Sequence, residues 1–431
     1  MDETALIAKV LLSSVVGSKV EVTLPSGTVL TGDLHSSLRD PAVRRCVVGR
    51  TLDLSKAYRQ VACSPEDAWA KIIVVWSPVA EAPVFFLQNA LPFGAAASVW
   101  SFNRASRALW RVGIDEFHLL WSNYVDDYPH IDIHALASSS RATSEAMFAL
   151  TGWQVSVSDK KTKGFLPSFD ALGANFDFGP AVMDSFFLVS NKEGRVAGLQ
   201  EIVSSAVASG KFTMSEASSF RGKVTYAESY LFGRIARYAM GPVAERAAGA
   251  GSMKSAMTTD LERSLNWIVK HLAGAASRKV QVTGEVKQPI LIFTDGACEG
   301  ELFSEVTCGA IIFDPAAMKS EYFGLRVEAA IVQRWKDAGG VDQVIAQAEL
   351  LPVLLARQVW AEWIRDRSVF FFIDNSSVLH CLINGFTKTQ ASRSMLLAIS
   401  ADDVKCPCRA WYSRVSSAAN PADAPSRLKF K

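Results

Sequence analysis

The amino-acid sequence predicts a multidomain α+β protein, and three observations support this prediction. The chain has 431 residues, which is too long for one ordinary hydrophobic core, so two or three domains are expected. Hydrophobic residues make up 49% of the chain and charged residues 20%, as in folded proteins. The pattern of apolar residues changes near residues 180 and 288, which divides the chain into the regions 1–180, 181–287 and 288–431.

Residues 1–180 are predicted to form an α+β domain. Three short runs of bulky apolar residues predict strands at 71–77, 84–90 and 117–125. Residues 98–112 place apolar side chains at the spacing of one helix face, so a helix is expected between the last two runs.

Residues 181–287 are predicted to be mainly helical. Thr213 and Glu216 have the spacing of a capping box, which predicts the start of a long helical run that continues to residue 240. Residues 272–288 combine small and polar residues without a strong period, so we expect a linker there.

Residues 288–431 are predicted to form one compact α/β unit, in which strands come first and helices then alternate with further strands. The expected strands are 290–296, 307–313, 321–327, 368–374 and 408–413, and the expected helices are 342–365, 376–385 and 391–401. A tail with the sequence NPADAPSR follows at 420–427.

Charge and cysteine usage narrow the class of protein. A net charge of +2 excludes a generally basic protein, so any nucleic-acid surface must be local. The seven cysteines show no CxxC pairs, which predicts neither a disulfide framework nor a zinc module and favours a reducing intracellular location, cytoplasmic or nuclear. The acidic N-terminus, with Lys9 inside its apolar run, is unlike a secretory signal, and no apolar run is long enough to predict a membrane span.

Two adjacent aspartates, Asp126 and Asp127, lie between apolar segments. Neighbouring like charges destabilise a fold unless a cation binds between them and other acids. Asp53 follows an apolar segment upstream, and residues 91–104 combine a Pro-Gly turn with small residues that begin a helix. An aspartate pair alone is most often a surface turn, but the three segments in this order favour the two-metal site of a nucleic-acid polymerase.

This ordered set resembles the reverse transcriptase family, whose motifs are similar to DLSKAYRQV at 53–61, LPFG at 91–94 and YVDD at 124–127. The resemblance implies a right-hand polymerase palm in which Asp53, Asp126 and Asp127 are catalytic and bind two Mg²⁺ ions, with Mn²⁺ as an alternative. It also implies that the carbonyl oxygen of Leu54 is a further metal ligand.

The resemblance also implies a substrate site. Tyr58 would be a steric gate that favours deoxynucleotides, with a packing aromatic as the alternative. Phe93 and Gly94 would contact the template and the incoming nucleotide. Phe93 stands where several viral members of the family carry a glutamine.

Two segments after the aspartate pair resemble further family motifs. In the first, Lys161 would stabilise the pyrophosphate, with Lys160 and Lys163 as rivals and a solvated charge run as the alternative. The second, FDALGANFDF, resembles the hairpin that grips the primer, with Leu172 and Gly173 at its turn.

The helical run after Thr213 occupies the place of the family's thumb or connection. By that resemblance its cations would neutralise phosphates of a bound duplex without reading sequence. An ordinary solvated helix face is the alternative for them. These cations are Arg221, Lys223, Arg234 and Arg237.

The C-terminal region has its own set of acids. Asp295 and Asp374 are expected to end apolar strands, and Glu349 lies on a predicted helix that can bring it beside them. With Asp423 of the tail, this order resembles the acidic tetrad of ribonuclease H, which binds two Mg²⁺ ions. The resemblance implies catalytic, metal-binding roles for all four acids and makes Asn375, Ser376 and Arg427 candidate contacts to the hybrid.

Two histidine observations complete the candidate sites. His130 and His134 form an HxxxH pattern, but no third ligand is evident, so surface histidines are expected. Many ribonucleases H carry a histidine in the loop before the last acid, whereas RVSSAANPAD at 414–423 has none.

Together the resemblances imply a retroelement enzyme, most similar to DIRS-like or related eukaryotic retrotransposons, with an incomplete fingers region because only residues 1–52 precede Asp53. Its partners would be an RNA template, a DNA primer, RNA:DNA hybrid and deoxynucleoside triphosphates. Two alternatives remain open: a degenerate or host-adopted protein that binds hybrids without polymerising, and a protein with ribonuclease H activity only.

Overall fold

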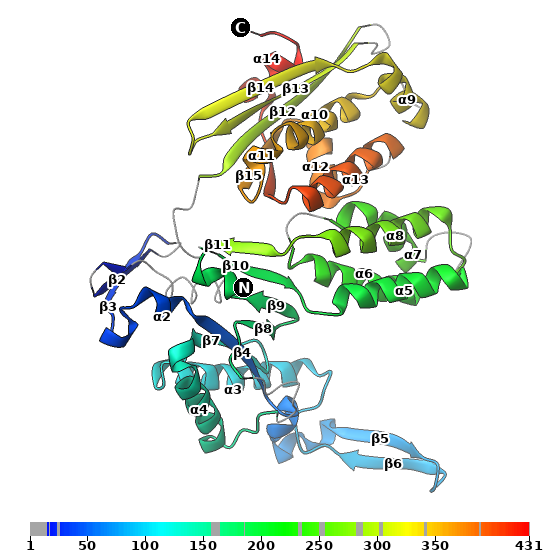
Figure 1. Ribbon diagram of the computed structural model, residues 1–431. Coiled ribbons are helices and arrows are strands. Elements are labelled where there is room, and N and C mark those ends of the chain that lie inside the picture. The colour runs from blue at the N-terminus through cyan, green and yellow to red at the C-terminus, as the bar shows by residue number, and fades with distance from the viewer. Residues whose placement is uncertain are drawn as a thin grey trace. The chain divides into compact units, whose positions relative to one another are not determined.

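The computed structural model describes residues 15–16, 18–23, 26–156, 164–184, 186–231, 235–249, 255–281, 288–300, 305–339, 343–387 and 389–430. They form two compact units, shown as a ribbon in Figure 1. Unit 1 comprises residues 1–192 with 279–284, and unit 2 comprises residues 193–278 with 285–431. Both units mix helices and strands.

Unit 1 is built around an antiparallel ladder between two strands, β4 (Val47–Asp53) and β7 (Asp127–Ile133). Two helices, α3 (Ala96–Asp115) and α4 (His134–Leu150), pack their apolar faces against this ladder. The predicted helical spacing of residues 98–112 is confirmed, because Phe102 and Leu109 of α3 are buried in the core. The core also contains Trp121, Tyr128 and Phe148.

Smaller sheets surround this core. The first has the order β1 (Val15–Val16), β2 (Lys19–Thr23) and β3 (Val29–Asp33), and short helices η1 (Ser36–Leu38) and α2 (Pro41–Arg45) follow it. The second has the order β11 (Arg278–Gln281), β10 (Phe186–Asn191), β9 (Ala174–Asp177) and β8 (Ser168–Ala171). The η2 (Ala57–Gln60), η3 (Pro65–Ala70) and η4 (Gly179–Val182) helices are short 3-10 helices.

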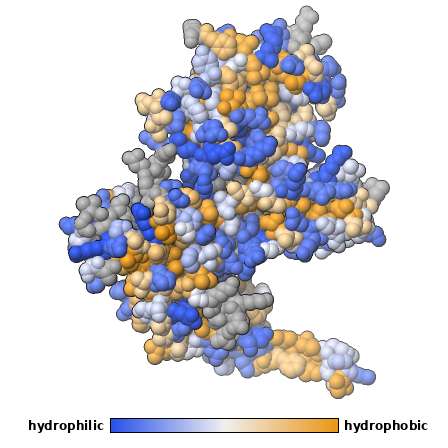
Figure 2. All heavy atoms as spheres, in the orientation of Figure 1, coloured by the Kyte–Doolittle hydropathy of each residue, from blue (hydrophilic) through white to orange (hydrophobic). Residues whose placement is uncertain are grey.

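The predicted strands at 71–77 and 84–90 form a hairpin of β5 (Ile72–Ser77) and β6 (Ala82–Leu87). Its large apolar side chains are exposed, and Figure 2 shows hydrophobic atoms along the projecting arm. Trp76 is 63% exposed and Phe85 65%. Among the described strands, β5 and β6 pair only with each other.

Two expectations for unit 1 are wrong. Residues 117–125 form no strand, because His118 and Val125 have positive φ angles of 52° and 57°, which interrupt an extended conformation. That segment contacts β7 only through isolated bridges at Trp121 and Tyr124. His130 is not a surface residue: it is buried in β7, and burial beside Arg50 lowers its pKa to about 3. His134 is exposed, as expected.

Unit 2 begins with a helical region whose apolar faces meet in one core. Its helices are α5 (Arg195–Ser209), α6 (Met214–Glu228), η5 (Arg237–Ala239), α7 (Gly241–Ala247) and α8 (Thr259–Gly274). The capping box is confirmed, since Thr213 and Glu216 exchange both of its hydrogen bonds.

The predicted long helix to residue 240 is wrong. The predicted linker at 272–288 is wrong for residues 272–274 and 278–281, which are helix and strand, whereas its residues 282–287 lie outside the described residues. Helix α6 ends at Glu228, whose carboxylate accepts a hydrogen bond from the backbone N–H of Ala236, so the chain folds back. Helix α8 continues to Gly274, and β11 then joins the β10 sheet. Pairing with a distant strand, rather than local composition, gives this segment its conformation.

The rest of unit 2 is a five-stranded mixed sheet with the order β14-β13-β12-β15-β16. Strands β12 (Ile290–Glu299), β13 (Glu305–Asp314) and β14 (Lys319–Arg326) are antiparallel, whereas β15 (Ser368–Ile373) and β16 (Arg409–Arg414) run parallel to β12. The helices are α9 (Ala329–Gly339), α10 (Ile345–Val359), α11 (Ala361–Ile364), α12 (Ser376–Asn384), α13 (Gln390–Lys405) and α14 (Asp423–Ser426), with a turn η7 (Ser417–Ala419).

The helical region and the sheet region of unit 2 share buried contacts. Tyr238 of η5 is part of the core under the sheet, and its hydroxyl donates to the carbonyl of Leu382 at 3.1 Å. The hydroxyl of Ser400 in α13 donates to the carbonyl of Ile235 at 2.6 Å. Among the described helices of both units, none combines the length and the apolar run needed to cross a membrane.

Candidate active sites

The first candidate site lies at one end of the β4–β7 ladder. Strand β4 ends at Asp53 and β7 begins at Asp127, and the register places these two residues directly opposite each other. The backbone N–H of Leu54 donates to the carbonyl of Asp126 at 3.2 Å. The structure therefore brings the three predicted polymerase aspartates to the same end of the ladder.

A tight turn presents the aspartate pair. Tyr124 and Asp127 exchange backbone hydrogen bonds of 2.9 and 3.0 Å, which leaves Val125 and Asp126 at the tip. Val125 has a φ of 57°, a left-handed conformation that is unusual and strained for a β-branched residue. The hydroxyl of Ser106 in α3 and the amide of Asn123 both donate to the Val125 carbonyl, so the surrounding structure holds this conformation in place.

The predicted substrate residues lie next to one another. Tyr58 is half-buried, and its ring stacks on Phe102 with a centroid distance of 4.8 Å. Its centroid is 5.1 Å from that of Phe93, which is 66% exposed, and Gly94 adopts a φ of 87° in the turn before α3. Tyr58 thus packs on the core while contacting an exposed aromatic.

Several predicted residues have other placements. Leu172 and Gly173 form the turn between β8 and β9, as expected, with φ angles of 49° and 74°. Lys161, with its rivals Lys160 and Lys163, and Arg234 lie outside the described residues.

The predicted thumb cations that the structure describes differ in their surroundings. Arg221 and Lys223 are exposed on α6. Arg237 instead donates from Nη1 to the carbonyl of Ile383 at 2.7 Å, inside unit 2.

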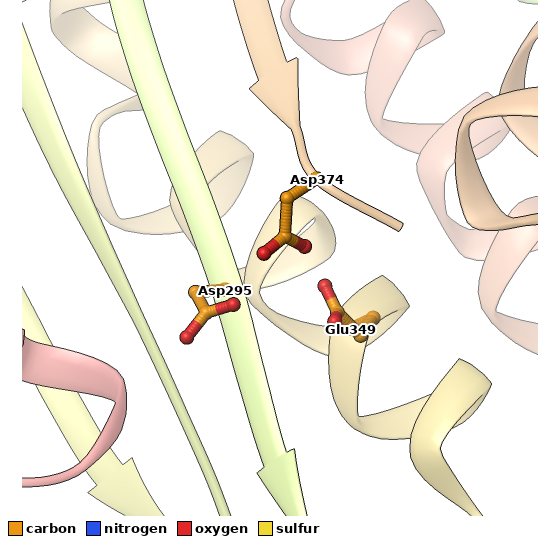
Figure 3. Close-up of side chains that lie close together, drawn as sticks. All are labelled: Asp295, Glu349 and Asp374. Carbon is orange, nitrogen blue, oxygen red and sulfur yellow. The ribbon is translucent and has the colours of Figure 1, made fainter. Parts of the chain in front are cut away.

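The second candidate site is a cluster of three carboxylates. Asp295 of β12, Glu349 of α10 and Asp374, the residue after β15, each place an oxygen within 4.8 Å of the others (Figure 3). The pairing of β12 with β15 ends at Thr294 and Ile373, so both aspartates follow the last paired positions. Within the described ranges this is the single group of three or more such residues that gathers this closely.

The expectation that Asp295 ends its strand is wrong, because β12 continues to Glu299 along β13. The side chain of Asp295 can nevertheless approach Glu349 and Asp374, because the pairing of β12 with β15 ends one residue before it. Asp374 does follow the end of its strand, as predicted.

Burial and mutual repulsion shift these acids toward their neutral forms. Burial raises the pKa of Asp295 to about 6. A hydrogen bond from Ser426 opposes this rise, and the charge of Asp374 adds to it. Burial and the charges of Asp374 and Asp295 raise the pKa of Glu349 to about 9. A cation at the cluster would relieve both effects.

The oxygens of the cluster fit a hard divalent ion. Oε2 of Glu349 and Oδ1 of Asp374 are buried and accept no hydrogen bond from the described residues. Buried carboxylate oxygens normally have donors, and carboxylates are the ligands that Mg²⁺ and Mn²⁺ prefer. The residues present therefore fit the ion that the sequence predicts.

Neighbouring polar residues support the cluster. Asn375 caps α12, where its Oδ1 accepts from the N–H groups of Ser377 and Val378, and its side chain also hydrogen-bonds Glu349. The hydroxyl of Ser426, fully buried in α14, donates to Oδ2 of Asp295. Sequence reasoning missed Ser426, although its position three residues after Asp423, on the same short helix, was a usable signal.

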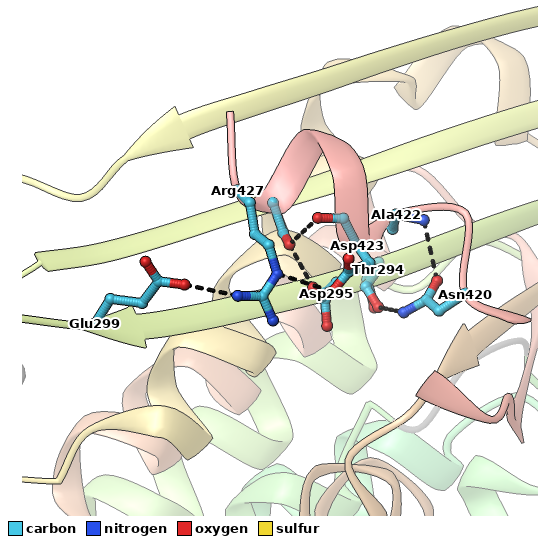
Figure 4. A network of polar contacts seen from close by, with 8 residues as sticks. Thr294, Asp295, Glu299, Asn420, Ala422, Asp423 and Arg427 are labelled. Carbon is cyan, nitrogen blue, oxygen red and sulfur yellow. Dashed lines mark hydrogen bonds and ion pairs between the residues drawn. The ribbon is translucent and has the colours of Figure 1, made fainter. Parts of the chain in front are cut away.

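The fourth predicted acid, Asp423, is outside the three-carboxylate cluster. Its side chain is 53% exposed and pairs with Nε of Arg427 at 3.0 Å (Figure 4). Arg427 also binds Glu299, at the end of β12, with an Nη1 to Oε1 distance of 2.6 Å. Asp423 is still close enough for its charge to raise the pKa of Asp295.

No family model matches the chain, and a search of curated proteins found no relative. Among solved structures, the chain is similar to a foamy viral protease-reverse transcriptase dRH in complex with double-stranded DNA (14% identity, TM-score 0.43), covering 92% of this chain and 64% of that one. It is also similar to the foamy viral protease-reverse transcriptase with RNA/DNA hybrid (13% identity, TM-score 0.44), covering 93% of this chain and 50% of that one. This chain thus spans less than two thirds of either length, and the likeness is a partial similarity of fold.

Proposed function

We propose that the chain is an RNA-directed DNA polymerase of a retroelement that also cleaves the RNA strand of RNA:DNA hybrids. The observation that carries the proposal is the Asp295, Glu349 and Asp374 cluster, in which two buried carboxylate oxygens accept no hydrogen bond from the described residues. The opposed positions of Asp53 and Asp127, next to a strained turn, support the polymerase half. The substrates would be an RNA template, a DNA primer and deoxynucleoside triphosphates, with RNA:DNA hybrid as the nuclease substrate.

The three regions of the sequence would divide this work. Residues 1–180 would form the fingers and palm, 181–287 a helical thumb or connection, and 288–431 the ribonuclease H-like domain. Arg221 and Lys223, exposed on α6, would neutralise backbone phosphates. The element would be DIRS-like or a related eukaryotic retrotransposon.

At the nuclease site, Asp295, Glu349 and Asp374 would hold Mg²⁺ or Mn²⁺, with Asp423 available from α14. Divalent ions bound there would activate a water molecule and stabilise the leaving oxygen. Ser426 orients Asp295 through its hydroxyl, and Asn375 orients Glu349. Both partners fix carboxylates before substrate binds, which favours catalysis because the site need not reorganise.

At the polymerase site, Asp53, Asp126 and Asp127 would hold the same type of ion, with the carbonyl of Leu54 as a further ligand. Tyr58 would exclude a ribose 2′-hydroxyl, because its ring is fixed against Phe102 and borders Phe93. Gly94, with a φ of 87°, gives the backbone beside Phe93 a turn that few other residues adopt. Lys161 remains the candidate for the pyrophosphate.

A nuclease without polymerase activity is the second candidate. One observation favours it: among described residues, only the C-terminal acids gather within 4.8 Å, and the three polymerase aspartates do not. A degenerate or host-adopted protein that binds hybrids without either activity is the third.

A paired assay in Mg²⁺ distinguishes these functions. Primer extension on an RNA template and cleavage of a labelled RNA:DNA hybrid are measured for the full chain, for Asp126→Asn and for Asp374→Asn. We expect Asp126→Asn to abolish extension and spare cleavage, and Asp374→Asn to do the reverse. Cleavage without extension by the unmodified chain would establish the nuclease alone, and hybrid binding without either activity would establish the binding protein.

A further inference from the structure

The last acid of the nuclease site is paired with an arginine on its own helical turn. Arg427 contacts Asp423 through Nε at 3.0 Å and Glu299 through Nη1 at 2.6 Å (Figure 4). One guanidinium therefore bridges a carboxylate of α14 and a carboxylate at the end of β12. The arginine side chain is 41% exposed, so it is also accessible from solvent.

The backbone that carries Asp423 is held closely against the sheet. In the strand register Gly309 pairs with Asp295, and Gly324 pairs with Gly309. A Cβ at Gly309 would lie 2.5 Å from the backbone nitrogen of Ser426, and a Cβ at Gly324 would lie 2.1 Å from the Pro425 carbonyl oxygen. Such distances show that α14 packs directly on the glycine backbone of β13 and β14, where no side chain intervenes. The amide of Asn420 adds a hydrogen bond of 3.1 Å to the carbonyl of Thr294.

Asp423 can therefore change its contacts mainly through its own side chain. One alternative partner is the Asp295 cluster, since the Asp423 charge already reaches Asp295. The other is the guanidinium that now holds it. The positive charge of Arg427 offsets the negative charge with which Asp423 would attract a divalent ion, so the two partners compete for this carboxylate.

We propose that Arg427 is a positioning residue that holds Asp423 away from the Asp295, Glu349 and Asp374 cluster and thereby couples hybrid binding to the binding of a second divalent ion. A backbone phosphate of the hybrid offers the guanidinium a stronger, bidentate partner. When Arg427 binds that phosphate, Asp423 becomes available as a ligand. This inference rests on the proposed nuclease function of the same site.

The test measures ion binding rather than activity. Mn²⁺ binding to the full chain is followed by calorimetry and electron paramagnetic resonance, with and without a hybrid whose RNA strand is 2′-O-methylated and cannot be cleaved. All proteins carry Asp126→Asn to weaken binding at the polymerase site. In this background, we expect the hybrid to tighten the second, weaker Mn²⁺ site.

Arg427→Ala should tighten that second site by roughly fivefold without hybrid, as expected from removal of a half-exposed ion pair, and the hybrid should then add little. Arg326→Ala is the matched control, because Arg326 forms an exposed pair with Glu305 on the same sheet, at 3.3 Å. It should leave Mn²⁺ binding unchanged. Arg427→Gln, which keeps a long polar side chain but removes the positive charge that pairs with Asp423, should tighten the site to a similar extent and provides a second test if Arg427→Ala does not fold.

Two results would overturn the proposal. In the first, Arg427→Ala and Arg427→Gln both bind Mn²⁺ as the parent protein does. In the second, the hybrid still tightens the weak site in Arg427→Ala. Asp374→Asn separates these failures from a failure of the nuclease site itself: if it leaves all Mn²⁺ binding intact, the cluster is not a metal site and the proposed function fails as well.

Discussion

Asp53 and Asp127 lie opposite each other at the end of the β4–β7 ladder, although 73 residues separate them along the chain. Directly opposed residues in an antiparallel pair have Cα atoms roughly 4.5–5.5 Å apart. Two acids at that separation repel each other unless a cation or a donor lies between them. Substitutions of these two aspartates therefore test for polymerase chemistry at this end of the ladder.

Asp53→Asn should reduce primer extension by roughly 100-fold or more, because it removes one of the charges that would bind the ions of the polymerase site. Hybrid cleavage should be unchanged, since the nuclease acids are elsewhere in the chain. Asp67→Asn, which changes an exposed acid of η3, is the control and should retain extension. Equal extension by the Asp53 and Asp67 variants would remove the polymerase assignment.

Tyr58→Val should relax discrimination against ribonucleotides by about tenfold or more, because the ring beside Phe93 would no longer fill the space of a 2′-hydroxyl. Tyr58→Phe keeps the ring and its stacking on Phe102, so it should keep the discrimination. Single-nucleotide incorporation with matched deoxy and ribo substrates measures the ratio. If both variants discriminate as the parent does, Tyr58 is a packing residue only.

Glu349 should make the stability of the protein depend on pH when divalent ions are chelated. Its pKa is raised from an ordinary 4.5 to about 9 in the folded chain, so the folded state binds a proton that the unfolded state releases. Between those two pKa values, stability should therefore fall as pH rises. Asp295, with a pKa raised to about 6, adds to the same trend.

Thermal unfolding in a chelator should show that the stability of the parent protein falls as pH rises. The fall should be much smaller for Glu349→Gln, which has no titrating group at position 349. Adding Mg²⁺ should stabilise the parent most at the alkaline end, where Glu349 is ionised, and should stabilise Glu349→Gln less. A parent protein that becomes more stable from about pH 6 to about pH 9 in chelator would contradict this account.

Gly309→Ala should impair the nuclease without touching an acid. The added methyl would lie 2.5 Å from the backbone nitrogen of Ser426, so α14 must shift and its hydrogen bond to Asp295 must weaken. We expect a loss of about 1–3 kcal/mol in unfolding free energy and reduced hybrid cleavage. Gly222→Ala on α6, where no atom lies within 4 Å of the added methyl, should cost neither stability nor cleavage.

Local patterns predicted the elements whose conformation depends on neighbouring residues. The capping box at Thr213, the turn at Leu172 and Gly173, and the apolar strand before Asp374 all follow from short-range chemistry. The three-carboxylate cluster was also predictable, because the order of strands and helices places those acids at one part of the sheet.

Features that depend on distant partners were not predictable in the same way. Asp295 was expected at a strand end, but β13 extends the pairing of β12 to Glu299. His130 has the pattern of a surface residue, yet the packing of Phe165 and Trp121 around its ring buries it. Helix α9 was missed because its apolar side chains, Val332 and Trp335, face a core that exists only after the sheet forms.

The buried contacts of Tyr238 and Ile235 with α12 and α13 have a practical consequence for dissecting the chain. A fragment that starts at residue 288 would lose the Tyr238 ring from its hydrophobic core. It would also lose the hydrogen bonds that Tyr238 makes to the Leu382 carbonyl and that Ser400 makes to the Ile235 carbonyl. Such a fragment should aggregate or melt early, whereas one that starts before α5 should unfold in a single cooperative transition.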